Sequence, residues 1–236
     1  MTNKWESIWK GKSPNISVND NVFDSFVQLK RANGFDVLAD GEYYQNFYSE
    51  FKQMVARIND NCGTFESVYE IGCGSGVNLY LFNRLFSIEK LGGLDYSESL
   101  LKIAKEVVQS DDLRCIDASS IDVKNKYDII LADSVFQYFT DAEKGYDIIN
   151  KMCQKANKAV VVTEIHDEEF RKEHISFRRS MIENYDKLYS GLDKTYYNKE
   201  TLIKYAKDRG YTCIIHKPLN DNYWNSRFVF DYYLIK

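Results

Sequence analysis

The stretch Val68–Gly76 reads Val-Tyr-Glu-Ile-Gly-Cys-Gly-Ser-Gly, and it constrains the fold more than any other part of the chain. Its apolar start predicts a buried strand, and its three alternating glycines predict a tight turn into a following helix. Because glycine has no Cβ, such a turn brings the backbone amides of the next helix close to a ligand. The alternative is a tight strand-to-helix turn that holds no ligand.

A carboxylate follows about twenty residues after the glycines, where a nucleotide-binding sheet places its ribose-binding acid. Leu91–Asp95 reads as a second strand that ends in Asp95. Asp95 can also cap the next helix, and the two roles are compatible. The spacing disfavours a dinucleotide, because the motif G-x-G-x-x-G requires a third glycine where the chain has Val77.

The heptapeptide Glu-Ile-Gly-Cys-Gly-Ser-Gly, with an acid two residues before its first glycine, resembles the first motif of class I S-adenosyl-L-methionine (SAM) dependent methyltransferases. The resemblance covers roughly residues 65–165. It implies a ribose site at the end of the second strand, an adenine site after the third strand, and a fourth strand whose exit borders the cofactor. The cofactor-binding residues predicted in this way are Glu70, Gly72, Cys73, Gly74, Gly76, Asp95, Tyr96, Asp117, Ala118, Asp133 and Ser134.

From residue 67 onward, predicted strands and helices alternate, which is typical of a parallel sheet covered on both faces. The predicted strands are Ser67–Ile71, Lys90–Asp95, Leu113–Ile116, Tyr127–Asp133 and Ala159–Ile165, followed by 211–217 and 227–235. The fold class is therefore α/β. The resemblance implies a doubly wound, Rossmann-like sheet of seven strands, mostly parallel, with the last strand antiparallel.

Helical patterns flank the predicted sheet. An apolar stripe from Tyr44 to Ile58 predicts a long helix, and a second stripe from Phe170 to Leu188 predicts another helix that caps the active site. Thr140, with Glu143 three residues later, predicts a capping box between the fourth and fifth strands. We predict one domain over 1–236, comprising an N-terminal helical lid (1–60), a SAM-binding core (61–166), and cap helices with the final strand pair (167–236). In small-molecule methyltransferases such an N-terminal segment commonly covers the cofactor, and packing on the sheet is the alternative.

Charge and cysteine usage narrow the expected partners. The 236 residues carry a formal net charge of −4, which disfavours nucleic acid because phosphate binding needs a basic surface. The five cysteines include no Cys-x-x-Cys pair, so neither a disulfide framework nor a zinc site is expected, and a reducing cytoplasm is the expected compartment. No apolar stretch has the length of a membrane span, and no metal-ligand cluster is recognised. A monomer or homodimer is expected.

An alcohol acceptor must lose a proton during methyl transfer, and a histidine or carboxylate suits that task. His166 follows a central strand at the expected ligand edge, so it is the predicted catalytic residue. Gln137, Tyr138 and His174 are the predicted substrate-binding residues, although His174 lies on an apolar stripe where packing is the alternative. Glu164 is a lesser candidate for positioning the acceptor.

The resemblance implies methyl transfer from SAM to O or N of a small molecule, with S-adenosyl-L-homocysteine (SAH) as the second product. Trp-Glu-Ser-Ile-Trp at residues 5–9 and Ser-Val-Phe-Gln-Tyr-Phe at 134–139 look like bacterial enzymes of sugar, capsule or secondary-metabolite pathways. A sugar hydroxyl or a nucleotide-linked sugar amine is the favoured acceptor. The alternatives are an NAD-dependent oxidoreductase, a methyltransferase-like binding subunit without activity, and a protein methyltransferase.

Overall fold

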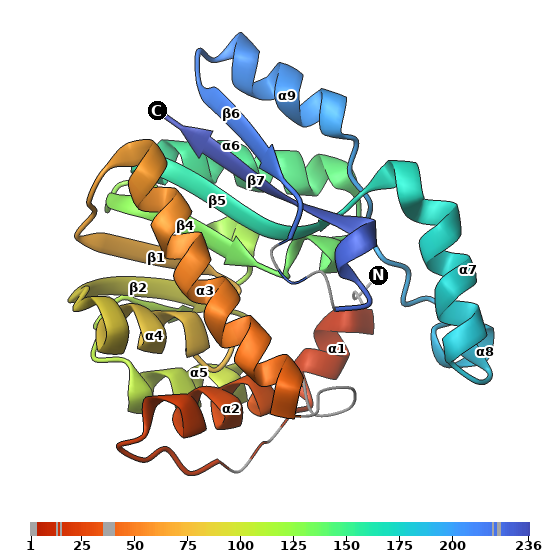
Figure 1. Cartoon of the computed structure of the whole chain (residues 1–236), viewed down its shortest axis with the longest axis horizontal. Helices are drawn as coiled ribbons and strands as arrows, with labels where there is room; N and C mark the ends of the chain where they lie inside the picture. The colour runs from red at the N-terminus through yellow and green to blue at the C-terminus, as the bar shows by residue number, and fades with distance from the viewer. Residues whose placement is uncertain (1–3, 13, 15, 35–40, 219, 221–222) are drawn as a thin grey trace.

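A seven-stranded sheet in the order β3-β2-β1-β4-β5-β7-β6 forms the centre of the molecule (Figure 1). The structure is a computed structural model, and it describes residues 4–12, 14, 16–34, 41–218, 220 and 223–236. The strands are β1 (Ser67–Ile71), β2 (Lys90–Asp95), β3 (Leu113–Cys115), β4 (Tyr127–Asp133), β5 (Ala156–His166), β6 (Thr212–His216) and β7 (Val229–Ile235). Strands β1 to β5 pair in parallel, while β7 is antiparallel to both β5 and β6. The predicted fold class is confirmed.

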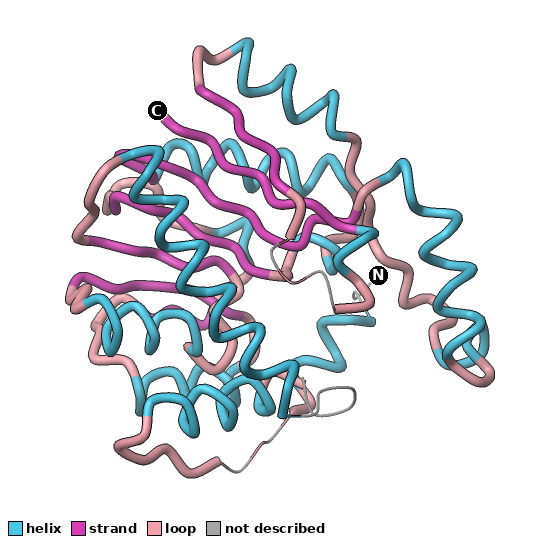
Figure 2. Tube along the Cα trace, viewed as in Figure 1, coloured by secondary structure: helices cyan, strands magenta, loops and turns pink. Residues whose placement is uncertain are grey.

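Helices cover both faces of this sheet (Figures 1 and 2). They are α1 (Lys4–Lys10), α2 (Val22–Ala32), α3 (Gly41–Cys62), α4 (Val77–Phe86), α5 (Glu98–Val107), α6 (Ala142–Lys155), α7 (Arg171–Met181), α8 (Tyr185–Leu188) and α9 (Lys199–Asp208). Short 3-10 turns lie at η1 (Ala118–Ser120), η2 (Phe136–Tyr138), η3 (Glu168–Phe170) and η4 (Ser226–Phe228).

Successive residues of the central strands enter two separate hydrophobic cores. On β4, Ile129 and Leu131 pack with α2, α3, α4 and α5, whereas Ile130 and Ala132 pack with α6 and α9. This alternation follows from the two-residue period of a strand. All four side chains are fully buried, which explains why β4 reads as a continuous apolar run rather than as an alternating one.

The N-terminal helices play different parts. Helix α3 crosses one face of the sheet (Figure 1), where Phe51, Val55 and Ile58 are buried in the same core as Val161 of β5. Packing on the sheet, the alternative interpretation of this stripe, therefore describes α3. Helix α1 lies instead beyond the carboxyl ends of the strands. Residues 35–40 of the predicted lid segment fall outside the described residues.

Two local predictions are wrong. The N-cap of α6 is Asp141, whose carboxylate accepts from the Lys144 N–H at 2.8 Å, while the Thr140 hydroxyl donates to Asp141 at 3.0 Å. Aspartate and threonine both cap well, so the motif alone left a one-residue ambiguity. The single long helix expected from Phe170 is instead a 3-10 turn followed by α7 and α8. The break between the two α-helices contains Asn184 in the left-handed region, with φ 56°.

Candidate cofactor site

The glycine-rich loop after β1 turns through left-handed backbone. Gly72 has φ 70° and Gly74 has φ 52°, conformations that side chains rarely tolerate. The N–H groups of Gly72 and Cys73 both donate to the Leu94 carbonyl oxygen, at 2.8 and 3.0 Å, which ties the loop to β2. A Cβ on Gly72 would lie 2.6 Å from Cγ2 of Val135, so this position also requires a close approach of two loops.

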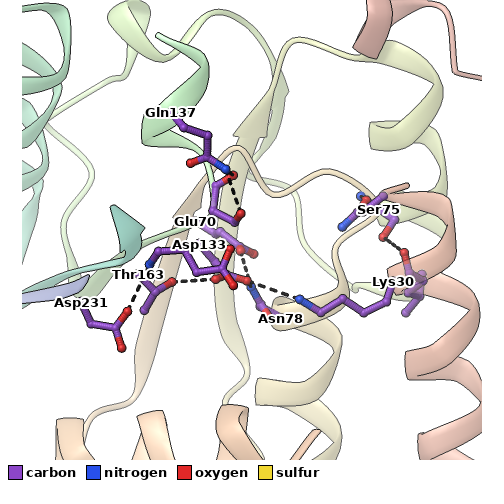
Figure 3. A network of polar contacts seen from close by, with 12 residues as sticks. Lys30, Glu70, Ser75, Asn78, Asp133, Gln137, Thr163 and Asp231 are labelled. Atoms are coloured by element: carbon purple, nitrogen blue, oxygen red, sulfur yellow. Dashed lines mark hydrogen bonds and ion pairs between the residues drawn. The ribbon is translucent and has the colours of Figure 1, made fainter. Parts of the chain in front are cut away.

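Helix α2 holds the same loop from the other side. The Asn33 side-chain oxygen accepts from the Ser75 N–H at 2.9 Å, and the Ser75 hydroxyl donates to the Leu29 carbonyl at 2.9 Å (Figure 3). These bonds join residues more than forty positions apart in the chain. The N-terminal segment is therefore part of the site's framework.

Asp95 ends β2 directly against this loop. Its Oδ2 accepts from the Gly74 N–H at 2.9 Å, and its Oδ1 accepts from the Ser97 N–H at 2.7 Å. Burial raises the pKa of Asp95, and the two N–H donors partly oppose that shift. The carboxylate thus braces the loop and begins α5, and it also faces the neighbouring cavity.

A cavity of about 510 Å³ lies at the carboxyl ends of β1, β2 and β4. Ligands of open α/β sheets bind at this edge, near the point where the strand order reverses between β1 and β4. Eight of the predicted cofactor residues line it: Gly72, Gly74, Asp95, Tyr96, Asp117, Ala118, Asp133 and Ser134. Its floor includes Ile71, Leu94 and Leu100, so an apolar base is edged by carboxylates, as a ligand with a flat ring and polar ends requires.

The other three predicted cofactor residues, Glu70, Cys73 and Gly76, are not part of the cavity wall. Cys73 is buried, and Gly76 packs against Ala104 of α5. Glu70 accepts from the Asn78 side-chain amide at 2.7 Å, and burial raises its pKa well above the usual range. In this structure these residues support the loop from inside the core.

A polar network runs from this buried support to the cavity (Figure 3). Asp133 accepts from the Thr163 hydroxyl at 2.6 Å and from the Asn78 amide at 3.0 Å, and the Lys30 ammonium lies 3.6 Å from its carboxylate. Burial alone would raise the pKa of Asp133, but Lys30, Thr163 and Asn78 outweigh it and hold the pKa below its usual value. Asp133 is therefore a charged group on the cavity wall.

Helix α1 contributes the side chains of Glu6 and Trp9 to the cavity wall. Trp9 lines the cavity, and its ring centroid lies 5.4 Å from that of Tyr138. The Ser97 hydroxyl donates to the Trp9 carbonyl at 2.9 Å, and the Trp5 indole N–H donates to the Asp193 carbonyl at 3.0 Å. This short helix thus bridges α5 and the segment after α8 across the mouth of the cavity.

The predicted catalytic and substrate-binding residues divide into two groups. Tyr138 lines the cavity, and the Gln137 amide beside it donates to the Ser134 hydroxyl and carbonyl, both at 2.9 Å. His166 and His174 lie outside the cavity lining, with ring centroids 4.7 Å apart, and His174 Nδ1 is 2.9 Å from the Tyr196 hydroxyl. Burial lowers the pKa of both imidazoles, that of His174 to about 3. Both are therefore weak proton acceptors, and the packing alternative describes His174.

Sequence reasoning did not single out Lys30, Asn33, Asn78 or Trp9 as site residues. Asn78 could have been recognised from the sequence, because it is a polar residue within the apolar run at the start of α4. In the structure it is 4% exposed. Lys30 and Asn33 gave no such signal, because Lys30 on α2 and Asn33 directly after it reach the site only through tertiary packing. Within the described residues, no helix is long and apolar enough to cross a bilayer, and no cluster of metal-ligating side chains is found.

The strand order, the glycine loop and the carboxylates at the strand ends together define the class I SAM-dependent methyltransferase fold. The chain belongs to the methyltransferase domain family, whose sequence profile matches residues 65–214.

Known relatives agree with this placement. Malonyl-[acyl-carrier protein] O-methyltransferase of Bacillus cereus is 23% identical over 144 residues, which cover 59% of this chain and 52% of that protein. The chain thus spans about half the length of that relative. The plantazolicin methyltransferase BpumL, solved with SAH and a desmethyl substrate analogue, aligns over 100% of this chain and 99% of its own with TM-score 0.62 and 16% identity. Magnesium protoporphyrin IX methyltransferase from Synechocystis PCC 6803, solved with SAM, aligns over 94% and 99% with TM-score 0.59 and 13% identity.

Replacing Trp9 by alanine should weaken SAH binding about 10-fold, because a buried aromatic wall contributes roughly 1.5–3 kcal/mol and α1 is partly open to solvent. The hydrogen bond from the Ser97 hydroxyl to the Trp9 backbone carbonyl would remain. Calorimetric titration measures the change, with Ile8→Ala as control, since Ile8 is on the same helix and 43% exposed. Equal affinities of the two variants would show that α1 does not cover the cofactor.

Proposed function

We propose that this chain transfers a methyl group from SAM to an oxygen or nitrogen of a small molecule, and that a sugar or nucleotide-linked sugar is the acceptor. SAM supplies an electrophilic methyl group. The chain's task is to hold the cofactor, orient the acceptor beside it and exclude water, because alignment of two reactants can contribute roughly 7–11 kcal/mol.

The residues on the cavity wall suit the parts of SAM. Asp95 would accept from the ribose hydroxyls, and Asp117 with the Ala118 N–H would bind the adenine edge. The amino-acid end would lie toward the glycine loop, where Lys30 and Asp133 offer opposite charges to its carboxylate and ammonium groups. Calorimetry with SAM, SAH and NAD tests this assignment, and binding of NAD in place of SAH would favour the oxidoreductase alternative.

A pair of cations near Tyr138 carries the acceptor assignment. Lys194 Nζ lies 3.9 Å from the Tyr138 ring centroid, and Arg178 is 7% exposed with its Nε unpartnered. Burial and the nearby Arg178 lower the pKa of Lys194 well below its usual value. None of the ion pairs among the described residues includes either cation. An anionic group such as a diphosphate would relieve the repulsion between the Lys194 and Arg178 charges. The faces of nearby tyrosine rings suit a sugar ring.

The acceptor assignment is tested by following SAH formation with a panel of substrates. The panel should contain nucleotide-linked hexoses and amino sugars, the same sugars without the nucleotide, and malonyl-acyl carrier protein. Turnover with a nucleotide-linked sugar that falls when the diphosphate is removed is the expected result. Turnover with malonyl-acyl carrier protein alone would instead favour the activity of the Bacillus cereus relative.

The variant Lys194→Met should raise KM for the nucleotide-linked acceptor about 10-fold or more, since a hydrogen bond to a charged group contributes roughly 1.5–3 kcal/mol. Methionine keeps the length of the side chain and its contact with the Tyr138 ring. SAH affinity should stay within about twofold. Lys187→Met, an exposed lysine on α8, is the matched control. An unchanged KM in Lys194→Met would remove the cation pair from acceptor binding.

A further inference from the structure

The same uncommon backbone conformation occurs near the carboxyl ends of two adjacent strands. Strands β4 and β5 pair so that Asp133 lies opposite Thr163, and the residue that follows each of these two in the chain is left-handed. Ser134 has φ 55° and Glu164 has φ 54°. Residues other than glycine seldom adopt this conformation, and those that do cluster at active sites, where the surrounding structure holds them.

A β-bulge re-aims Glu164. Val162 pairs with Tyr232 and Ile165 with Phe230, so two residues of β5 face the single residue Asp231 on β7. Asp231 Oδ1 accepts from the Glu164 N–H at 3.1 Å, which holds the bulge in place (Asp231 is labelled in Figure 3). Bulges beside active sites commonly turn a side chain toward the ligand.

The Glu164 side chain lines a small cavity of about 50 Å³ that adjoins the cofactor cavity. Lys30, Asp133 and Ser134 line both, so the carboxylate lies next to the end of β4 that faces the cofactor. On the opposite side the small cavity is bounded by Phe47 and Met54 of α3. Glu164 therefore lines the small cavity beside the cofactor cavity but not the cofactor cavity itself, whereas His166 is absent from both linings.

Charged groups from every neighbouring element face Glu164. Three acids interact electrostatically with Glu164: Glu50 of α3, Asp133 of β4 and Asp231 of β7. Two cations, Lys30 of α2 and Lys194, and two tyrosines, Tyr138 and Tyr223, complete the surroundings. The Asp133 carboxylate is paired with Lys30 and accepts hydrogen bonds from Thr163 and Asn78. The Asp231 carboxylate accepts from the Glu164 N–H and lies 3.9 Å from Arg57.

These surroundings set the proton affinity of Glu164. Burial and the negative charge of Asp133 raise its pKa to about 7, while the Ser134 hydroxyl opposes the shift. A general base works best when its pKa is near the pH of the reaction. Burial lowers the pKa of His166 well below its usual value, which makes that imidazole a poorer proton acceptor than the carboxylate two residues before it.

We propose that Glu164 is the catalytic residue that accepts the proton of the acceptor hydroxyl, an inference that rests on the proposed function. As the hydroxyl oxygen bonds to the methyl carbon, the carbon–sulfur bond breaks and its electron pair stays on sulfur. The hydroxyl proton passes to the Glu164 carboxylate and leaves from there to solvent. Both products, the methyl ether and SAH, are neutral at the reacting atoms.

The first test is kinetic and uses Glu164→Gln with the best sugar substrate of the acceptor panel. We expect kcat to fall about 100-fold, since general bases contribute roughly 100- to 10,000-fold, while SAH affinity stays within about twofold. In the wild type kcat should rise with pH through about 7, because only the deprotonated carboxylate accepts a proton. The kcat of Glu164→Gln should not show this rise with pH. Glu169→Gln, an exposed acid on η3, is the control.

The second test needs no acceptor, so it separates this inference from the proposed function. In the chain labelled at the glutamate carboxyl carbons and bound to SAH, the NMR signal that is missing from Glu164→Gln should titrate near pH 7. The signal of Glu70, whose pKa burial also raises, is identified separately by its absence from Glu70→Gln. Glu164→Gly should fold at least as stably as the wild type, because glycine adopts φ 54° without strain, and should be as inactive as Glu164→Gln. A Glu164→Gln enzyme with wild-type kcat, or a Glu164 signal with a midpoint below pH 6, would overturn the assignment.

Discussion

Replacing Gly72 by alanine is expected to abolish measurable SAH binding and to lower the free energy of unfolding by about 2–4 kcal/mol. Two costs add at this position. The backbone has φ 70°, and the new Cβ would lie 2.6 Å from Cγ2 and 3.1 Å from Cγ1 of Val135. Val135 lines the cavity next to Ser134, so relief of the clash would displace the wall that faces the cofactor. Calorimetric titration with SAH and chemical denaturation measure the two effects.

Gly63→Ala separates the two costs. Gly63 has φ 73°, nearly the same backbone strain, but nothing lies within 4 Å of an added Cβ. This control should lose only about 1 kcal/mol of stability and bind SAH normally. The double variant Gly72→Ala/Val135→Ala removes the clashing methyl groups and should recover part of the affinity. If Gly72→Ala alone binds SAH as tightly as the wild type, the loop does not depend on close approach at this point.

The interior strands were predictable because their residue pattern alone demands burial. Ile129 to Ala132 enter cores on both faces, as do Val68, Tyr69 and Ile71 of β1, so an apolar run bounded by turns has few other solutions. The ends of elements were less predictable. The stripe from Phe170 continues through Met181 and Leu188, yet these are 69% and 60% exposed, so the described part of the chain does not bury this end of the stripe as a continuous helix would require. Periodicity reports a face of a helix and cannot report whether anything covers that face.

In the candidate site, too, residues in local motifs were predictable, whereas residues that reach the site through tertiary contacts were not. The glycine loop, Asp95 and Asp133 follow from short motifs and from the rule that parallel strands end at one edge. Asn33 reaches the Ser75 N–H from 42 positions away, and no local pattern announces such a contact. His166 was placed correctly at the end of a strand, but its burial beside His174 depends on how α7 folds back.

The role proposed for Glu164 depends on features that the sequence pattern does not contain. A glutamate two residues before a strand end reads as an ordinary half-buried position. Its importance in this structure comes from a bulge opposite Asp231 and from positive φ, neither of which alters the residue pattern. A strained backbone conformation is held by the surrounding folded structure. It marks positions where tertiary contacts outweigh the local conformational preference of the residue.

Replacing Asp95 by alanine is expected to weaken SAH binding at least about 100-fold, because two hydroxyl donors to a carboxylate contribute roughly 1.5–3 kcal/mol each. The same change removes the acceptors of the Gly74 and Ser97 N–H groups, so the free energy of unfolding should also fall by about 1–3 kcal/mol. Asp95→Asn keeps the shape and one acceptor oxygen, and we expect it to lie between wild type and alanine in both measurements.

Asp117→Ala is the control for the loss of SAH affinity expected in Asp95→Ala. Asp117 lines the same cavity, but its side chain is 47% exposed, and its carboxylate already accepts from the Ser119 N–H at 2.8 Å and from Lys144 at 3.3 Å. Water can replace a contact there, so we expect only about a 10-fold loss of affinity. A loss confined to Asp117→Ala would place the tighter end of the cofactor at the adenine site. Unchanged SAH affinity in Asp95→Ala would show that the ribose assignment is wrong, even with the fold intact.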